Sequence, residues 1–195
     1  KLCHTRSSDE VEHLEDSLRR IDDRNHWYIA GGSSGGSAVA VAIGASFAAL
    51  SSDTGGSTRN PASRVGIVGF KPSYGTVSRF GLIPLTHSLD VPGIMARNVQ
   101  DVASVFAHIR GIDQRDSTTV DTANVAQSSS RHMLKDLTIG IPHEYRCEDL
   151  DENIAKAWDE VSELLVDSGA RVVQISLPNT RHSLPCYSIL NTCEV

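Results

Sequence analysis

A stretch rich in glycine and serine, residues 28–40 (YIAGGSSGGSAVA), constrains the fold of this chain more than any other feature. Four glycines and three serines lie between a short apolar run and an alanine-rich one. Glycine permits sharp backbone turns and close approach to a ligand, so the stretch indicates a specialised loop. Residues 26–30 (HWYIA) predict a short strand before it, and residues 37–50 (SAVAVAIGASFAAL) predict a buried helix after it.

A second loop of the same kind, residues 51–63 (SSDTGGSTRNPAS), follows this helix. We expect the two serine-bearing loops to meet at one end of a sheet. A serine nucleophile needs a base, which a lysine can supply in place of histidine. Adjacent glycines allow several backbone N–H groups to point at one spot, as an oxyanion hole requires.

Three other interpretations of residues 28–40 are open to the sequence alone. A phosphate-binding loop needs a lysine after its glycines, and the G-x-G-x-x-G fingerprint of dinucleotide sites is absent. A flexible linker does not fit the apolar flanks. A nucleophile elbow, G-x-S-x-G, is matched with Ser34 at its centre, but it needs an acid and a histidine. The later histidines are His87, His108, His132, His143 and His182.

The rest of the chain predicts an α/β fold. Residues 65–70 (VGIVGF) indicate a buried strand, and residues 71–85 indicate irregular structure. A helix is expected over residues 98–111, with Asn98 as its N-cap, Val99 among the apolar residues of its buried face and Gly111 after its end. Residues 137–142, 151–169 and 170–178 then predict a strand, a helix and a strand, which together form a βαβ unit.

We expect a single, incomplete domain, because the chain starts without methionine and ends inside a predicted helix. Its predicted parts are a charged insert or linker at 1–26, a core at 27–111, a surface loop at 112–134 and the βαβ segment at 135–195. Within the first part, residues 9–25 are expected to form either a solvated amphipathic helix or an inserted linker.

Charge and composition exclude several classes of function. A net charge of −6 provides no basic field to hold nucleic acid without help. No apolar run reaches the roughly 18 residues of a membrane span. The four cysteines form no C-x-x-C pair, so neither a metal site nor a disulfide framework is expected.

Residues 31–75, from GGSSGGS through SSDTGGSTRNPAS to GFKPSYG, resemble the amidase signature of the amidase family of Ser-Ser-Lys hydrolases. The resemblance is strong over residues 28–110 and looser to residue 195. It implies an α/β/α sandwich around a mixed β-sheet, of which this chain is a part. Residues 69–103 and 113–120 resemble the branch of A subunits of glutamyl-tRNA(Gln) amidotransferases. The charged insert and residues 58–62 (TRNPA) resemble its mitochondrial form.

The resemblance implies a role for each matching residue. Ser57 matches the acyl-forming nucleophile, and Ser33, after a cis Gly32–Ser33 peptide bond, matches the serine that relays its proton. Asp53 and Arg59 match positions that support the site. The backbone N–H groups implied for the oxyanion hole are those of Thr54, Gly55, Gly56 and Ser57. The chain's lysines, Lys1, Lys71, Lys135 and Lys156, do not match the catalytic lysine, which we expect upstream of this chain.

The implied activity is hydrolysis of glutamine to supply ammonia for converting Glu-tRNA(Gln) to Gln-tRNA(Gln) in the mitochondrial matrix. The implied partners are two other subunits in a heterotrimer, with Glu-tRNA(Gln) held through the complex. ATP and Mg²⁺ are used by the complex, and no cofactor, metal or membrane is expected on this chain. A stand-alone amidase of the same family and a catalytically inactive fragment are the alternatives.

Overall fold

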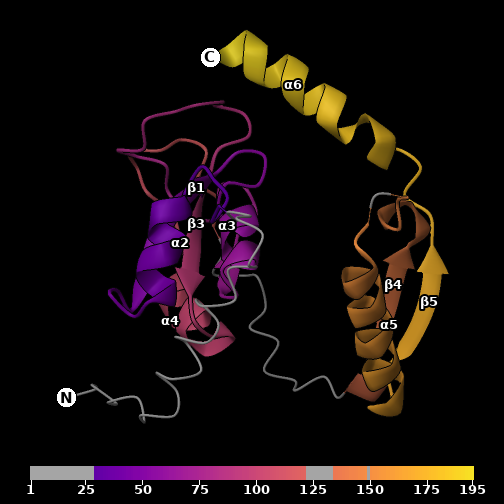
Figure 1. Cartoon of the computed structure of the whole chain (residues 1–195). Coiled ribbons are helices and arrows are strands. Elements are labelled where there is room, and N and C mark those ends of the chain that lie inside the picture. Colours follow the sequence, from indigo (N-terminus) through magenta and orange to yellow (C-terminus); the bar gives the residue numbers. More distant parts are fainter. Residues whose placement is uncertain (1–28, 122–133, 149) are drawn as a thin grey trace.

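The computed structural model describes residues 29–121, 134–148 and 150–195, and it contains two sheets (Figure 1). The first is antiparallel, with strand order β1-β3-β2, formed by β1 (Ala48–Asp53), β2 (Val68–Phe70) and β3 (Val91–Ala96). Helices α2 (Gly35–Ala42), α3 (Arg59–Arg64) and α4 (Val99–Ile109) accompany it. Short 3-10 turns lie at Leu134–Asp136 (η1), His143–Tyr145 (η2) and Thr180–His182 (η3).

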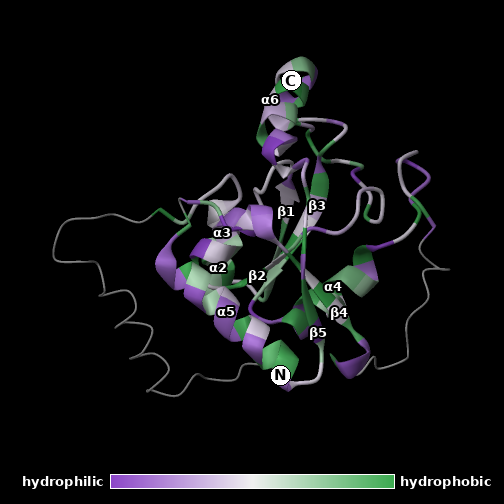
Figure 2. Ribbon diagram, turned by 90° about the vertical axis from the view of Figure 1, so that its right-hand side faces the viewer, coloured by the Kyte–Doolittle hydropathy of each residue, from purple (hydrophilic) through white to green (hydrophobic). Residues whose placement is uncertain are grey.

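The second sheet confirms the predicted βαβ unit. Strand β4 (Thr138–Pro142) pairs in parallel with β5 (Arg171–Ile175), and α5 (Glu152–Asp167) connects them. Figure 2 shows α5 banded in purple and green, as expected of an amphipathic helix. The last helix, α6 (Ser183–Glu194), lies at the top of Figure 1, above the end of the first sheet.

Strand β3 forms the centre of the core. Ile94, Met95 and Ala96 have no exposed surface. Because successive side chains of a strand point to opposite faces, Met95 packs with Ala38 and Val41 of α2, whereas Ile94 packs with Val102 of α4. The sheet therefore lies between two helices on opposite faces, which confirms the expected α/β/α layering.

Strand β3 was not predicted from the sequence, although it is the most buried of the described strands. Pro92 and Gly93 lie within it, and both residues argue against a central strand because proline has no N–H and glycine packs no side chain. Strand β2 pairs only with residues 94–96, whereas β1 pairs with all of 91–96. The missing N–H of Pro92 therefore lies where β3 has a neighbour on one side only.

The predicted helix over residues 37–50 is wrong at both ends. Helix α2 starts at Gly35 and ends at Ala42, and residues 48–50 belong to β1. Gly44 has a φ of +75°, the left-handed conformation that commonly ends a helix. A strand was predicted at residues 26–30. Of these, Ile29 and Ala30 do not form a strand, and residues 26–28 lie outside the described residues.

Helices α4 and α5 lie close to their predicted bounds, although some of the residues predicted to face inward are exposed. The Asn98 side chain caps α4 by accepting a hydrogen bond from the Asp101 N–H at 2.8 Å, as expected. Val99, predicted to face inward, is 64% exposed. In α5, Trp158 and Leu165 are half-buried, but the other three residues predicted to face inward are exposed: Ile154, Val161 and Leu164. The strand predicted at 65–70 is confirmed only for residues 68–70.

We expect Gly93→Ala to destabilise the full-length protein, because an added Cβ would lie 2.7 Å from Thr58 Cγ2 in a fully packed region. Such overpacking typically costs about 1–3 kcal/mol. Gly36→Ala is the matched control, since nothing lies within 4 Å of a Cβ there and alanine favours a helix. Thermal unfolding midpoints measure both. A Gly93→Ala midpoint equal to that of the wild type would contradict this packing.

Candidate active site

The two glycine loops meet at the end of β1, as the sequence predicts. The Ser34 N–H donates to the Ser57 carbonyl oxygen at 3.2 Å, and the Ser34 hydroxyl donates to the Ser52 carbonyl at 3.4 Å. The Gly32–Ser33 peptide bond is cis, as the resemblance implies. Ser57 is half-buried and Ser33 is exposed. The loop residues 31–34 thus lie against the loop that carries Ser57.

Asp53 holds the loop that carries Ser57 in its curved conformation. Its side chain is fully buried, and its two oxygens accept five hydrogen bonds. The Gly56 N–H donates to one oxygen at 2.8 Å, and the N–H groups of Thr58 and Arg59 donate to the other at 3.0 and 3.2 Å. The Arg59 guanidinium binds both oxygens, at 2.9 and 3.1 Å.

This set of donors also fixes the charge of Asp53. Burial raises the pKa of its carboxyl, but the hydrogen bonds from the Arg59 side chain and the Thr58 N–H, with the charge of Arg59, lower it by more. The net pKa of Asp53 lies below its ordinary value, so the group is a carboxylate at neutral pH. A carboxylate that accepts five hydrogen bonds is suited to holding a loop rather than to exchanging protons.

The predicted oxyanion donors differ in their surroundings. The Gly56 N–H donates to Asp53, so it is engaged within the loop. In the part of the chain that the structure describes, the Gly55 N–H has no acceptor. An oxyanion role for the N–H groups of Thr54, Gly55 and Ser57 stays a prediction.

Two residues beside this loop were not found from the sequence. Tyr187 of α6 lies over Gly55, so close that a Cβ on Gly55 would be 2.7 Å from the tyrosine ring. Asp90, almost fully buried, accepts a 2.5 Å hydrogen bond from the Thr54 hydroxyl. Neither residue belongs to a local motif that spacing could reveal.

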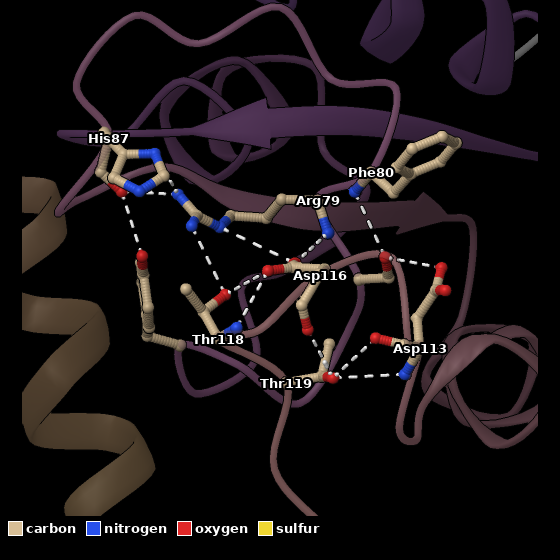
Figure 3. Close-up of polar contacts among 9 residues, drawn as sticks. Arg79, Phe80, His87, Asp113, Asp116, Thr118 and Thr119 are labelled. Atoms are coloured by element: carbon tan, nitrogen blue, oxygen red, sulfur yellow. Dashed lines mark hydrogen bonds and ion pairs between the residues drawn. The ribbon is translucent and has the colours of Figure 1, made fainter.

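A separate polar network fixes the irregular segment between β2 and β3 (Figure 3). The Arg79 side chain is 8% exposed; its guanidinium donates to the His87 carbonyl oxygen and, at 3.3 Å, to the Thr118 hydroxyl. Asp116 accepts the Arg79 N–H at 2.7 Å, and Asp113 accepts from Ser78 at 2.9 Å. Residues 113–119 are thereby tied to the turn around His87.

The histidines do not support a nucleophile elbow at Ser34. His108 contacts the Ser104 carbonyl within α4, His143 contacts the Ile175 carbonyl, and His182 contacts Arg181. His132 lies outside the described residues, and among the others none contacts Ser34. The Lys71 ammonium donates to the Pro72 carbonyl, and Lys156 pairs with Glu160.

Comparison with known proteins identifies the family. The sequence profile of the family described as Amidase matches residues 23–195. The chain belongs to the amidase family. Among the residues that the structure describes, no cluster of histidine, cysteine, aspartate or glutamate could hold a metal ion. In the same part of the chain, no helix is long and apolar enough to cross a bilayer.

Relatives of this amidase-family chain include mitochondrial glutamyl-tRNA(Gln) amidotransferase A subunits. That of Pediculus humanus subsp. corporis is 54% identical over 176 residues, which are 90% of this chain and 36% of the relative. That of Mus musculus is 51% identical over 185 residues, 94% of this chain and 35% of the relative. The chain thus spans about a third of the length of these relatives.

Solved structures share the fold. The A subunit of the Thermotoga maritima glutamyl-tRNA(Gln) amidotransferase is 39% identical, with a TM-score of 0.79 over 85% of this chain and 36% of that protein. The peptide amidase of Stenotrophomonas maltophilia is 31% identical, with a TM-score of 0.71 over 85% of this chain and 34% of that protein. The same architecture therefore occurs both in an amidotransferase subunit and in a peptide amidase.

Proposed function

We propose that this chain is part of the glutamine-hydrolysing subunit of an amidotransferase that converts Glu-tRNA(Gln) to Gln-tRNA(Gln). The observation that carries the proposal is the meeting of the two serine loops, with Ser57 on a loop that Asp53 clamps from its buried side. High identity to A subunits with that name supports the choice of substrate. Because these relatives are mitochondrial proteins, the similarity also supports a mitochondrial location.

In the proposed reaction, the Ser57 hydroxyl oxygen attacks the amide carbon of glutamine. Its proton passes to Ser33 and from there to the lysine base that the family resemblance implies. Backbone N–H groups of the loop stabilise the negative oxygen of the tetrahedral intermediate. The carbon–nitrogen bond breaks as the nitrogen takes up a proton, and ammonia leaves. Water then hydrolyses the glutamyl ester, which releases glutamate and restores the Ser57 hydroxyl.

The ammonia is proposed to pass to a partner subunit, which activates the tRNA-bound glutamate with ATP and Mg²⁺. Two partner subunits complete the heterotrimer. The absence of a phosphate-loop motif and the net charge of −6 fit this division of work, because they leave ATP and tRNA to the partners.

A pair of adjacent serine variants tests the assignment of the relay. We expect Ser33→Ala to lower glutamine hydrolysis by the assembled complex by about 10²–10⁴-fold, the usual contribution of a positioned proton-transfer group. Ser34→Ala is the matched control, with activity near that of the wild type. It retains the backbone N–H that reaches Ser57 and loses only a long hydroxyl contact. A larger loss in Ser34→Ala than in Ser33→Ala would reverse the assignment and favour the nucleophile elbow.

A stand-alone amidase is the second candidate, favoured by the likeness to the peptide amidase structure. The two candidates differ in what the full-length protein binds and hydrolyses. Co-purification with two partner subunits and turnover of glutamine support the proposal. A protein that purifies alone and hydrolyses simple or peptide amides supports the stand-alone amidase.

A further inference from the structure

Asp90, in the turn before β3, joins three parts of the molecule. Its side chain is almost completely buried. One carboxylate oxygen accepts the Thr54 hydroxyl at 2.5 Å, and the other accepts the N–H groups of Leu85 and Thr86 at 2.7 and 3.0 Å. A buried carboxylate without its hydrogen bonds is costly, so this arrangement holds Thr54 and the turn together.

The turn held by Asp90 is also tied to α6. The Thr86 hydroxyl donates to Asn191 at 2.6 Å, and the Ser88 hydroxyl and N–H donate to Glu194 at 2.6 and 2.9 Å. The same helix places Tyr187 over Gly55. Asp90 therefore connects the loop of Ser57, through residues 85–90, to the helix that covers that loop.

The position of this turn is itself fixed from its outer side. The Arg79 guanidinium donates to the carbonyl oxygen of His87, and the Tyr74 hydroxyl donates to the same oxygen at 3.0 Å (Figure 3). The Asp116 carboxylate in turn accepts a hydrogen bond from the Arg79 backbone N–H. The turn thus has supports on both sides, and its only described side-chain hydrogen bond to the loop of residues 53–57 is the Asp90–Thr54 contact.

We propose that Asp90 is a positioning residue for amide hydrolysis. Through the Thr54 hydroxyl it fixes the first peptide of the Thr54–Ser57 segment, so that the oxyanion donors and the Ser57 oxygen keep the geometry that the transition state requires. The inference rests on the proposed function, because it assumes that Ser57 is the nucleophile. Misplacing such groups by about 1 Å can cost on the order of 100-fold in rate.

The test uses the full-length subunit in its complex and compares Asp90→Ala, Thr54→Val and the double variant. Each single variant is expected to lower kcat for glutamine hydrolysis by about 100-fold with KM little changed. Because Asp90→Ala already removes the Thr54–Asp90 contact, adding Thr54→Val to it is expected to cause no further loss. Thr54→Ser keeps the hydroxyl and is expected to have the kcat of the wild type. In all of these variants, amidation with added ammonia is expected to stay at the wild-type rate.

Asp159→Asn is the matched control, because that carboxylate pairs with Arg146 on the surface. Losses that multiply in the double variant, or a Thr54→Val variant with the kcat of the wild type, would overturn the inference. If Asp90→Ala does not fold, Thr54→Val against Thr54→Ser still decides it. If the Ser57→Ala variant still hydrolyses glutamine at the rate of the wild type, the proposed function itself is overturned. The two failures are therefore distinguishable.

Discussion

In the full-length subunit assembled with its partners, Ser57→Ala is expected to abolish glutamine-dependent formation of Gln-tRNA(Gln). Loss of a serine nucleophile lowers hydrolysis on the order of a millionfold, because no other group can form the acyl-enzyme. Amidation driven by added ammonium chloride is expected to proceed at the wild-type rate, since that route bypasses the ester. Measuring aminoacyl-tRNA with glutamine and with ammonium as the alternative nitrogen source separates the two routes.

Ser63→Ala is the matched control for this experiment. Ser63 is exposed in α3, and its hydroxyl donates to the Asn60 carbonyl at 2.8 Å. Both activities are expected to persist in that variant. If Ser57→Ala loses the ammonium-driven reaction as well, the role of ammonia donor is wrong for this protein, provided that the variant still assembles with its partners.

Asp53→Asn is expected to have the second-largest effect. The substitution replaces one acceptor oxygen by a donor group, so that some of the N–H groups of Gly56, Thr58 and Arg59 lose their acceptor. Each buried donor left without an acceptor costs about 1–3 kcal/mol. We expect a lower thermal midpoint, and the distorted loop is expected to lower glutamine hydrolysis by about 100-fold or more. Asp101→Asn is a suitable control, because the Asp101 side chain is at the start of α4, where it accepts a hydrogen bond from the Asn98 side chain.

The effect on stability is expected to depend on pH with a defined sign. The folded protein lowers the pKa of Asp53, so its carboxylate contributes full stability above the ordinary value of 3.8. That contribution is lost as the pH falls below 3.8 and through the folded-state pKa. The difference in unfolding free energy between wild type and Asp53→Asn is therefore expected to be constant at neutral pH and to shrink below about pH 3.8. A difference that grows on acidification would contradict the assigned hydrogen bonds.

The sequence predicted those parts of the site that local chemistry determines. Two glycine-rich loops with serines are compatible with only a few functions. The lack of a lysine after the first set of glycines argues against a phosphate-binding loop, and the lack of a histidine in a recognisable motif argues against a nucleophile elbow. The cap at Asn98 and the βαβ unit followed from side-chain chemistry and apolar spacing. Strand β3 was missed because Pro92 and Gly93 oppose strand formation locally, and only packing between α2 and α4 overrides that preference.

The support around the loop could not be predicted from spacing. Asp90 lies far from Thr54 in the sequence, and Tyr187 is farther still from Gly55. Their contacts depend on the pairing of β3 with β1 and on the position of α6 over the loop that carries Gly55. Neither the pairing nor the position of α6 was predicted from the sequence. Long-range contacts of this kind carry no periodic signal in a single sequence.

Mapping the acylated residue is the most direct test of whether Ser57 is the nucleophile. The full-length complex is mixed with glutamine, quenched rapidly in acid and digested with trypsin. Cleavage after Arg24 and Arg59 leaves Ser33, Ser34 and Ser57 in one peptide, so fragmentation mass spectra are needed to locate the glutamyl ester. The ester is expected on Ser57, and none is expected in the Ser57→Ala variant. An ester on Ser33 or Ser34, with Ser57 unmodified while glutamine is being hydrolysed, would contradict it.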